Sequence, residues 1–98
     1  MKFGDVLKSI QDGHMAYRNC WDDNVAIWLK PSCVIKADWC KDPILKMLCE
    51  SNNGALYAEA VMCMVNDGAI VTGWTPTAED MLADDWVIIY KEEIYECK

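Results

Sequence analysis

The residues best suited to ligand chemistry are two tryptophans and an arginine beside polar turns. Trp21 and Trp74 each follow a predicted strand and precede or join a polar turn, where a large ring is well placed to stack on a nucleotide base. Packing in the core is the alternative for either ring. Arg18 lies three residues before Trp21 and can donate a forked pair of hydrogen bonds to a phosphate, although a structural salt bridge explains it equally well.

A second candidate lies in the loop from Thr75 to Thr77, directly before a predicted short helix that runs through Ala83. The free N–H groups of a helix N-terminus favour an anion. Thr77 also suits the N-cap, and Asp80 stands three residues later, as in a capping box with aspartate in place of glutamate. Capping by Thr77 explains the same residues without any ligand.

The groups needed for catalysis are sparse. His14 is the only histidine and has no partner that the sequence can nominate as part of a dyad or triad. Paired acids could serve as general acid and base or as magnesium ligands, but turn and tail chemistry explains them as solvated residues. These pairs are Asp22-Asp23, Asp84-Asp85 and Glu92-Glu93. Phosphate-loop, dinucleotide-binding and zinc-protease motifs are missing, so we predict a protein that is not an enzyme and has no cofactor.

The six cysteines are scattered, without a C-x-x-C pair and with one histidine to accompany them. That spacing does not match a zinc site, so no metal is expected. Disulfides of a secreted domain are one interpretation of six cysteines, and free thiols acting as small hydrophobes in a reducing cytoplasm are the other. The missing spacing patterns favour free thiols. The set comprises Cys20, Cys33, Cys40, Cys49, Cys63 and Cys97.

Composition limits the partners. The chain has 98 residues and a net charge of -7, which repels nucleic-acid backbones and anionic membrane surfaces, so neither genomic nucleic acid nor a membrane is an expected partner. No apolar run is long enough to cross a bilayer, and the N-terminus lacks the features of a secretory signal. The apolar share of 53%, including five tryptophans, exceeds what one small core needs, which points to contacts with a ligand or another subunit.

Hydrophobic periodicity predicts an α+β domain with a small antiparallel sheet. Apolar residues from Phe3 to Ile10 recur with helical spacing, and Gly13 ends that helix. Strands are expected over 15–18, 25–30, 56–65, 69–73 and 86–90, with a tight turn at 66–68. Short helices are expected over 43–49, behind Asp42-Pro43, and from the Thr77 cap through Ala83. Residues 31–42 show no assignable pattern, and the middle of the chain is interpreted as an elaborated connection.

Turns too short for parallel crossovers make the predicted sheet antiparallel. One sheet covered by one helix leaves an apolar face open, and such a face on so small a domain predicts a homo-oligomer. Residues 1–98 are predicted to form a single domain.

Both ends of the chain resemble the Thoeris anti-defence family of the second type. The opening resemblance comprises Met1 to Leu7, Gly13, and Ala16 to Trp21. The closing stretch, Gly73 to Trp86, resembles the family's final segment, in which a Trp and a Ser or Thr before a short helix lead to an acidic residue and Asp-Trp. Together the two stretches cover about half of the chain. Cys20 stands where the family usually has glycine, and residues 31–56 match no family feature.

The resemblance implies a phage protein that acts in the cytoplasm of the host bacterium. It would bind glycocyclic ADP-ribose, made by a Toll/interleukin-receptor domain enzyme, and hold this signal intact so that the Thoeris effector stays inactive. Family members form homotetramers with ligand pockets between subunits, and some hold cyclic di- or trinucleotides in separate pockets. The protein would therefore be a dimer or tetramer that sequesters a cyclic nucleotide signal.

The resemblance also implies roles for individual residues. Trp21 would stack on the base, and Trp74, Thr75, Thr77 and Asp80 would line or shape the pocket. Arg18 matches the basic position ahead of the tryptophan, and a contact with phosphate is our inference. The competing hypothesis is an acidic protein that inhibits a host factor by binding it through surface charge and tryptophans. A small hydrolase of the same signal is disfavoured by the missing base and metal ligands.

Overall fold

The computed structural model describes residues 1–92, which divide into two compact units. Unit 1 combines Met1–Lys30 with the chain from Val61 onward, and unit 2 is Pro31–Ala60. Unit 1 contains α1 (Phe3–Gln11), β1 (Met15–Arg18), β2 (Val25–Lys30), β5 (Val61–Asn66), β6 (Ala69–Thr72), α3 (Ala78–Leu82) and β7 (Trp86–Ile89). Unit 2 contains β3 (Cys33–Lys36), the 3-10 helix η1 (Ala37–Trp39), α2 (Pro43–Ser51) and β4 (Ala55–Ala58).

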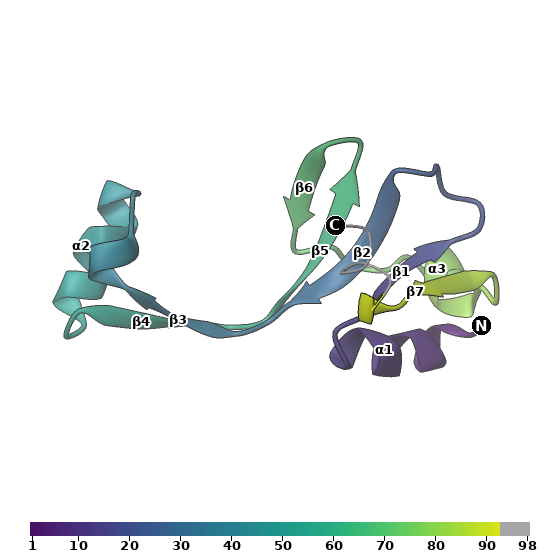
Figure 1. Ribbon diagram of the computed structural model, residues 1–98, viewed down its shortest axis with the longest axis horizontal. Helices are drawn as coiled ribbons and strands as arrows, with labels where there is room; N and C mark the ends of the chain where they lie inside the picture. The colour runs from purple at the N-terminus through teal and green to yellow at the C-terminus, as the bar shows by residue number, and fades with distance from the viewer. Residues whose placement is uncertain (93–98) are drawn as a thin grey trace. The chain divides into compact units, whose positions relative to one another are not determined.

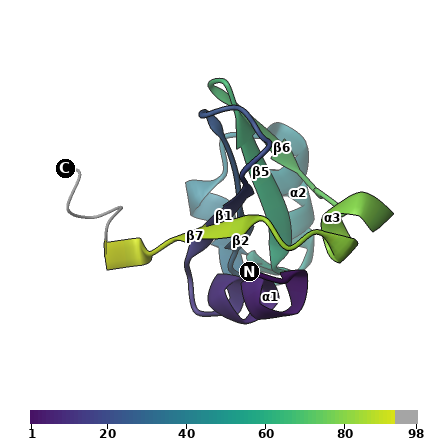
Figure 2. The ribbon, with the colours of Figure 1, turned by 90° about the vertical axis from the view of Figure 1, so that its right-hand side faces the viewer.

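Unit 1 is built on a five-stranded antiparallel sheet in the order β6-β5-β2-β1-β7 (Figure 1). The pairing of Ala16 with Ile27 joins β1 to β2, and the pairing of Arg18 with Trp86 joins β1 to β7. Helix α1 lies along one side of these strands in both views (Figures 1 and 2). The α+β class and the antiparallel sheet predicted from the sequence are confirmed.

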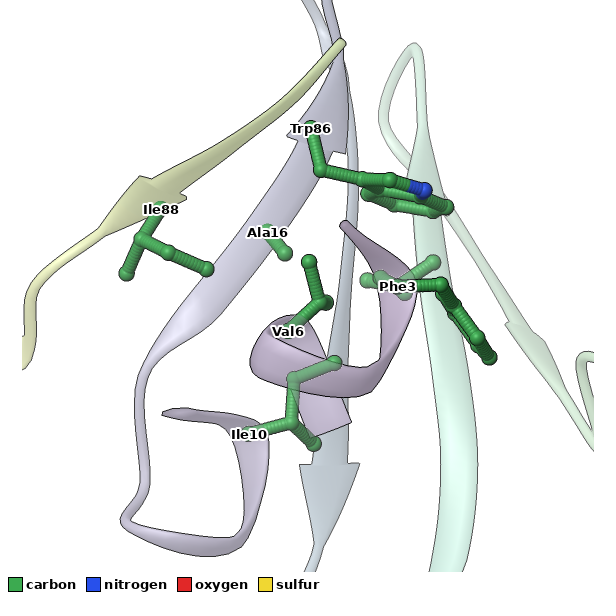
Figure 3. Packing of buried hydrophobic residues seen from close by; sticks show 7 residues of the cluster. Phe3, Val6, Ile10, Ala16, Trp86 and Ile88 are labelled. Carbon is green, nitrogen blue, oxygen red and sulfur yellow. The ribbon is translucent and has the colours of Figure 1, made fainter. Parts of the chain in front are cut away.

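The core of unit 1 forms between α1 and one face of the sheet (Figure 3). Helical spacing brings Phe3, Val6 and Ile10 onto one side of α1, and all three are buried. They meet Ala16, Ile27, Trp86 and Ile88 of the sheet. The helix ends as predicted, because Gly13 adopts a left-handed φ of +95°, which costs glycine little.

The opposite face of the sheet is also apolar. Side chains alternate along a strand, so the neighbours of core residues point away from α1. Met15, Tyr17, Trp28, Val65, Val87 and Ile89 are on that face, and all six are partly exposed. The open apolar face expected from the sequence is therefore present within the described residues.

The connection from β5 to β6 is a two-residue hairpin turn. Asp67 and Gly68 both have positive φ, 48° and 85°, which is the backbone of the turn that best matches the twist of a hairpin. Asn66 pairs with Ala69 across it. The predicted turn is confirmed.

Unit 2 corrects one sequence prediction. The expected strand over 56–65 is wrong: β4 pairs only with β3 in a separate two-stranded sheet, and β5 pairs with β2 and β6 in the sheet of unit 1. Glu59 and Ala60 lie between the two strands without strand structure. An apolar run records burial but not strand partners, so it cannot show where a chain leaves one sheet for another.

Helix α2 begins as the sequence predicts. Pro43 occupies its first turn, and the Asp42 carboxylate accepts a hydrogen bond of 3.0 Å from the Ile44 N–H. The helix continues to Ser51, two residues beyond the predicted end. Among residues 1–92 no helix is long and apolar enough to cross a membrane.

Candidate functional site

The site begins at the end of β1, where Arg18 is held by carboxylates. Its Nε donates to Asp85 Oδ1 at 3.0 Å, and its Nη1 donates to Asp80 Oδ1 at 3.1 Å and to Glu79 Oε1 at 3.4 Å. Only 9% of Arg18 is exposed. The hydrogen bond to Asp85, more than compensating for burial, raises the pKa of Arg18, so the guanidinium stays charged. Arg18 therefore forms the structural salt bridge that the sequence offered as one of its two roles.

Asp80 connects this ion cluster to the start of α3. Its Oδ2 accepts the Thr77 backbone N–H at 3.0 Å, and its own N–H donates to Thr77 Oγ1 at 3.1 Å, which completes a capping box. Burial alone would raise the pKa of Asp80, but hydrogen bonds from the Thr77 backbone and Arg18 outweigh burial and lower it. Asp80 is therefore an ionised structural centre as well as a residue of the site.

Four aromatic rings form a continuous cluster above this centre. Trp86 packs against Phe3 with ring centroids 5.4 Å apart, and its Nε1 donates to the Asp80 carbonyl at 2.9 Å. Trp21 meets Trp86 edge-on at 5.2 Å and Trp74 edge-on at 6.2 Å. Because Trp86 is buried and hydrogen-bonded, it fixes the orientation of the half-buried Trp21 ring.

Backbone hydrogen bonds position the two outer tryptophans. The Trp21 N–H donates to the Arg18 carbonyl at 2.9 Å, which closes a turn directly after β1. The Trp74 N–H donates to the Met62 carbonyl at 3.0 Å, which holds the end of β6 against β5. Two segments about fifty residues apart in sequence thus present their rings at one place.

Trp21 borders two concavities. The smaller, about 390 Å³, is lined by Cys20, Trp21, Asp22, Val25, Met64, Asn66, Trp74 and Asp80. The larger, about 730 Å³, extends over the loop from Asn19 to Asn24 and the sheet face opposite α1, and includes Tyr17 and Asp67. Neither lining contains a lysine or arginine from residues 1–92. The surfaces offer stacking faces, amides and carboxylates.

The structure brings most of the predicted site residues together. Trp21, Trp74 and Asp80 line the smaller concavity, and Arg18 is linked to it through Asp80. Thr75 and Thr77 are exposed in the adjacent loop and are outside both linings. The side-chain cap predicted for Thr77 is confirmed.

Sequence reasoning missed the supporting roles of Trp86 and Asp85. Both residues form the Asp-Trp pair at the start of β7. The pair was visible in the sequence, but Arg18, the partner of Asp85, lies more than sixty residues away. The available signals were the Asp-Trp pair itself and an aromatic residue that begins an apolar strand. His14 lies elsewhere, where its Nδ1 accepts the Lys91 N–H at 3.0 Å.

No candidate metal centre arises from the described part of the chain. Residues 1–92 contain no group of three or more His, Cys, Asp or Glu side chains arranged to hold a metal ion. The groups that line the two concavities at Trp21 can stack on a ligand and form hydrogen bonds with it.

Acid is expected to destabilise the protein through this ion cluster. The hydrogen bond from Arg18 lowers the pKa of Asp85. Hydrogen bonds from the Thr77 backbone and Arg18 lower the pKa of Asp80. Carboxyls whose folded pKa lies below the unfolded value of about 4 stabilise the fold above that value and lose this contribution as pH falls through the folded pKa. The melting temperature should stay level between about pH 5 and 7 and fall below about pH 4.

Thermal unfolding followed by tryptophan fluorescence from pH 7 to 2.5 tests this expectation. Arg18→Gln provides the comparison. Without the guanidinium, Asp85 loses its main favourable partner and Asp80 keeps only its hydrogen bonds with Thr77, so the melting temperature of the variant should fall less steeply in acid. Equal slopes for the two proteins would contradict the assignment of acid sensitivity to the cluster.

Comparison with known proteins identifies the family of this chain. The family model described as Tad2-like, Thoeris anti-defense 2-like domain, matches residues 1–89, including the segment in which the sequence alone showed no resemblance. Thoeris anti-defense 2 of Bacillus phage SP01 is 28% identical over 90 residues, covering 91% of this chain and 94% of that protein. The chain therefore belongs to the Thoeris anti-defence 2-like family of phage anti-Thoeris proteins.

Proposed function

We propose that this protein binds a cyclic nucleotide signal of the Thoeris system, glycocyclic ADP-ribose, and sequesters it without degrading it. The effector would then remain inactive because free signal is scarce. The observation that carries the proposal is the half-buried Trp21 ring, fixed by Trp86 and Trp74 at the border of two concavities. Membership in the anti-Thoeris family supports a target within the Thoeris system.

Trp21 is proposed to stack on the base of the ligand. A ring that is already oriented loses little conformational freedom when a ligand arrives, so more of the stacking energy contributes to affinity. Trp74 and Asp80 would form one wall of the same concavity. From the adjacent loop, Thr75 would offer hydroxyl and backbone donors, and Thr77 would offer its hydroxyl, because its N–H is held by Asp80.

Arg18 is proposed to position the site instead of contacting phosphate. Its Nε and Nη1 are committed to three carboxylates, which more than balance its single positive charge and hold it inside the fold. Through Asp80 and Asp85 it joins the end of β1 to α3 and the start of β7. Its removal would therefore move the walls of the concavity.

A second copy of the chain is proposed to complete the site. The ligand carries phosphate charge, but the described linings around Trp21 contain carboxylates and no cationic side chain. Amide groups such as those of Asn19, Asn24 and Asn66 can donate hydrogen bonds, and another subunit can add the missing positive groups. This argument supports a homo-oligomer, a dimer or a tetramer, with ligands bound at its interfaces.

The surface of α2 supports self-association. Ile44, Met47 and Leu48 are spaced as one helical stripe, and all three are exposed, whereas the buried hydrophobic residues of unit 2 are the small Ala37 and Cys49. Unit 2 holds three lysines against four acidic residues, so most of the chain's negative charge lies in unit 1. Two acidic copies would therefore meet with least repulsion through unit 2.

Met47→Glu is expected to reduce the molecular mass in solution, because it places a charge within the apolar stripe. Sedimentation of the purified protein at several concentrations measures the mass. Lys46→Glu is the matched control, since it adds more negative charge in the same helix but outside the stripe. Equal masses for Met47→Glu and the unaltered protein would count against this interface.

The proposal also states that the protein does not transform its ligand. Arg18 lowers the pKa of Asp85, and the Thr77 backbone together with Arg18 lowers the pKa of Asp80, so both carboxyls are poor proton donors near neutral pH. His14 is bonded to the backbone at Lys91, at the opposite end of β7 from Trp86. These contacts support capture over hydrolysis.

Calorimetric titration tests the function directly. The purified protein is titrated with glycocyclic ADP-ribose, cyclic dinucleotides and cyclic trinucleotides, then denatured by heat, and the released ligand is analysed by chromatography and mass spectrometry. Tight binding with the ligand recovered unchanged supports sequestration. A shortened or opened product would mean hydrolysis and would overturn the proposal.

A protein-binding inhibitor of a host factor is the alternative function, and the exposed apolar stripe of α2 is the observation that favours it. It predicts no binding of any cyclic nucleotide in the titration. Inhibition of Thoeris would then be weakened by a charge in that stripe, as in Ile44→Glu, and preserved in Trp21→Leu. Sequestration of the signal predicts instead that Trp21→Leu loses inhibition of Thoeris.

A further inference from the structure

Unit 2 has little to hold it together besides its backbone hydrogen bonds. It spans Pro31–Ala60, and its buried hydrophobic residues are only Ala37 and Cys49. Chains shorter than about 40 residues usually need a disulfide, a metal or a partner to be stable. A covalent link within unit 2 would therefore have a large effect on its stability.

Two of its thiols already lie in contact. Cys40 directly follows η1 and Cys49 lies in α2, and their Sγ atoms are 4.0 Å apart. Cys49 is fully buried with its Sγ 3.6 Å from the Ile35 carbonyl oxygen, whereas Cys40 is partly exposed with its Sγ 3.3 Å from the Lys36 carbonyl oxygen. Rotation of the more accessible Cys40 side chain can bring the sulfurs to the bonding distance of about 2.05 Å.

Other described cysteines lack this arrangement. Cys20 and Cys33 are exposed, and Cys63 is buried in the sheet of unit 1, where its Sγ contacts the Val61 carbonyl oxygen at 3.8 Å. Among residues 1–92, the pair of Cys40 and Cys49 is the one contact between thiols. Geometry therefore selects this pair from the cysteines that the structure describes.

We propose that Cys40 and Cys49 are a redox-sensitive pair that forms an intramolecular disulfide and staples η1 to α2. The oxidant is a low-molecular-weight disulfide. The Cys40 thiolate attacks one sulfur of that disulfide, forming a mixed disulfide and releasing one thiolate. The Cys49 thiolate then attacks Cys40 Sγ and expels the second. The two cysteines lose two electrons and two protons, and the oxidant becomes two thiols.

Cys40 is the first nucleophile because Cys49 is closed to a bulky oxidant by its burial. Burial and the hydrogen bond with Cys49 raise the pKa of Cys40, so little thiolate is present at neutral pH. Cross-linking should consequently be slow in a reducing cytoplasm and advance under sustained oxidation. In the chain-entropy description, closing this short loop lowers the unfolding equilibrium constant of unit 2 on the order of 100-fold.

Peptide mapping identifies the link. The full chain is incubated with oxidised glutathione, free thiols are alkylated, and the protein is digested with trypsin and glutamyl endopeptidase under non-reducing conditions. The expected product joins peptide 37–41 to peptide 47–50, and reduction separates them. Glutathione retained on Cys40 without the link, or a link from either residue to Cys33, would overturn the proposal.

Matched variants separate the link from general oxidation. Cys33→Ser, which removes an exposed thiol of the same unit, should still form the link, and Cys40→Ser should not. Hydrogen exchange of the α2 amides should slow on the order of 100-fold when the unaltered chain is oxidised. Cys40→Ser should show no slowing. Unchanged exchange in a cross-linked chain would remove the stapling role, and the mapping of the unaltered chain decides the link even if a variant fails to fold.

Discussion

Replacement of Trp21 by leucine is expected to weaken binding of the cyclic nucleotide by about 5- to 150-fold, which corresponds to the loss of about 1 to 3 kcal/mol of stacking. Leucine keeps an apolar side chain at the border of the two concavities but has no ring face for a base. The dissociation constant is measured by calorimetry at a temperature where both proteins are folded.

Two further variants make this result specific. Trp21→Phe retains a smaller ring and should bind between the unaltered protein and Trp21→Leu. Trp39→Leu removes an exposed tryptophan of unit 2 and should leave the dissociation constant unchanged. Equal affinities for Trp21→Leu and the unaltered protein would show that Trp21 is a packing residue and would remove the main support for the proposed site.

Asp80→Ala is expected to lower the free energy of unfolding by about 3 kcal/mol. The change removes a buried carboxylate from Arg18 and removes one half of the capping box of α3. Asp85 still accepts a hydrogen bond from Arg18, so the guanidinium retains a partner. The loss of stability therefore stays at the lower end of the range for a broken buried ion pair. Urea unfolding followed by tryptophan fluorescence measures the change.

Glu79→Ala is the matched control for Asp80→Ala. Glu79 is the preceding residue of α3 and contacts the same Arg18 Nη1, but its side chain is 80% exposed. An exposed ion pair contributes little, so the change should stay within about 0.5 kcal/mol. Similar losses from the two substitutions would contradict the view that burial makes Asp80 the centre of the cluster.

The two predictions are linked by the architecture of the site. Asp80 and Arg18 hold α3 and the start of β7 in place. Trp86 donates a hydrogen bond to the Asp80 carbonyl, and Trp21 packs against Trp86. Asp80→Ala should therefore also weaken ligand binding, whereas Trp21→Leu should affect binding more than it affects folding. For each variant, the change in ligand affinity is compared with the change in the free energy of unfolding. A residue that supports the site changes both, whereas a residue that contacts the ligand changes mainly the affinity.

Local features of this fold could be predicted from the sequence because neighbouring residues determine them. Helical spacing from Phe3 to Ile10, the Asp42-Pro43 start of α2 and the Thr77 cap of α3 each depend on side chains within about one turn. The hairpin at Asp67-Gly68 likewise follows from residues that accept positive φ. The family could be inferred from the two ends of the chain, because the residues there occur in the order and spacing of the family's motifs.

Tertiary structure alone decided the rest. The sequence offered Arg18 either a phosphate or a salt bridge, and its ion pairs with Asp80 and Asp85 form because tertiary packing, with β1 paired to β7, brings these residues close. The division of the predicted strand 56–65 between two sheets depended on which strands lie beside it. Periodicity and capping are properties of a few adjacent residues, whereas strand partners, buried charges and ring contacts are fixed only when distant segments pack together.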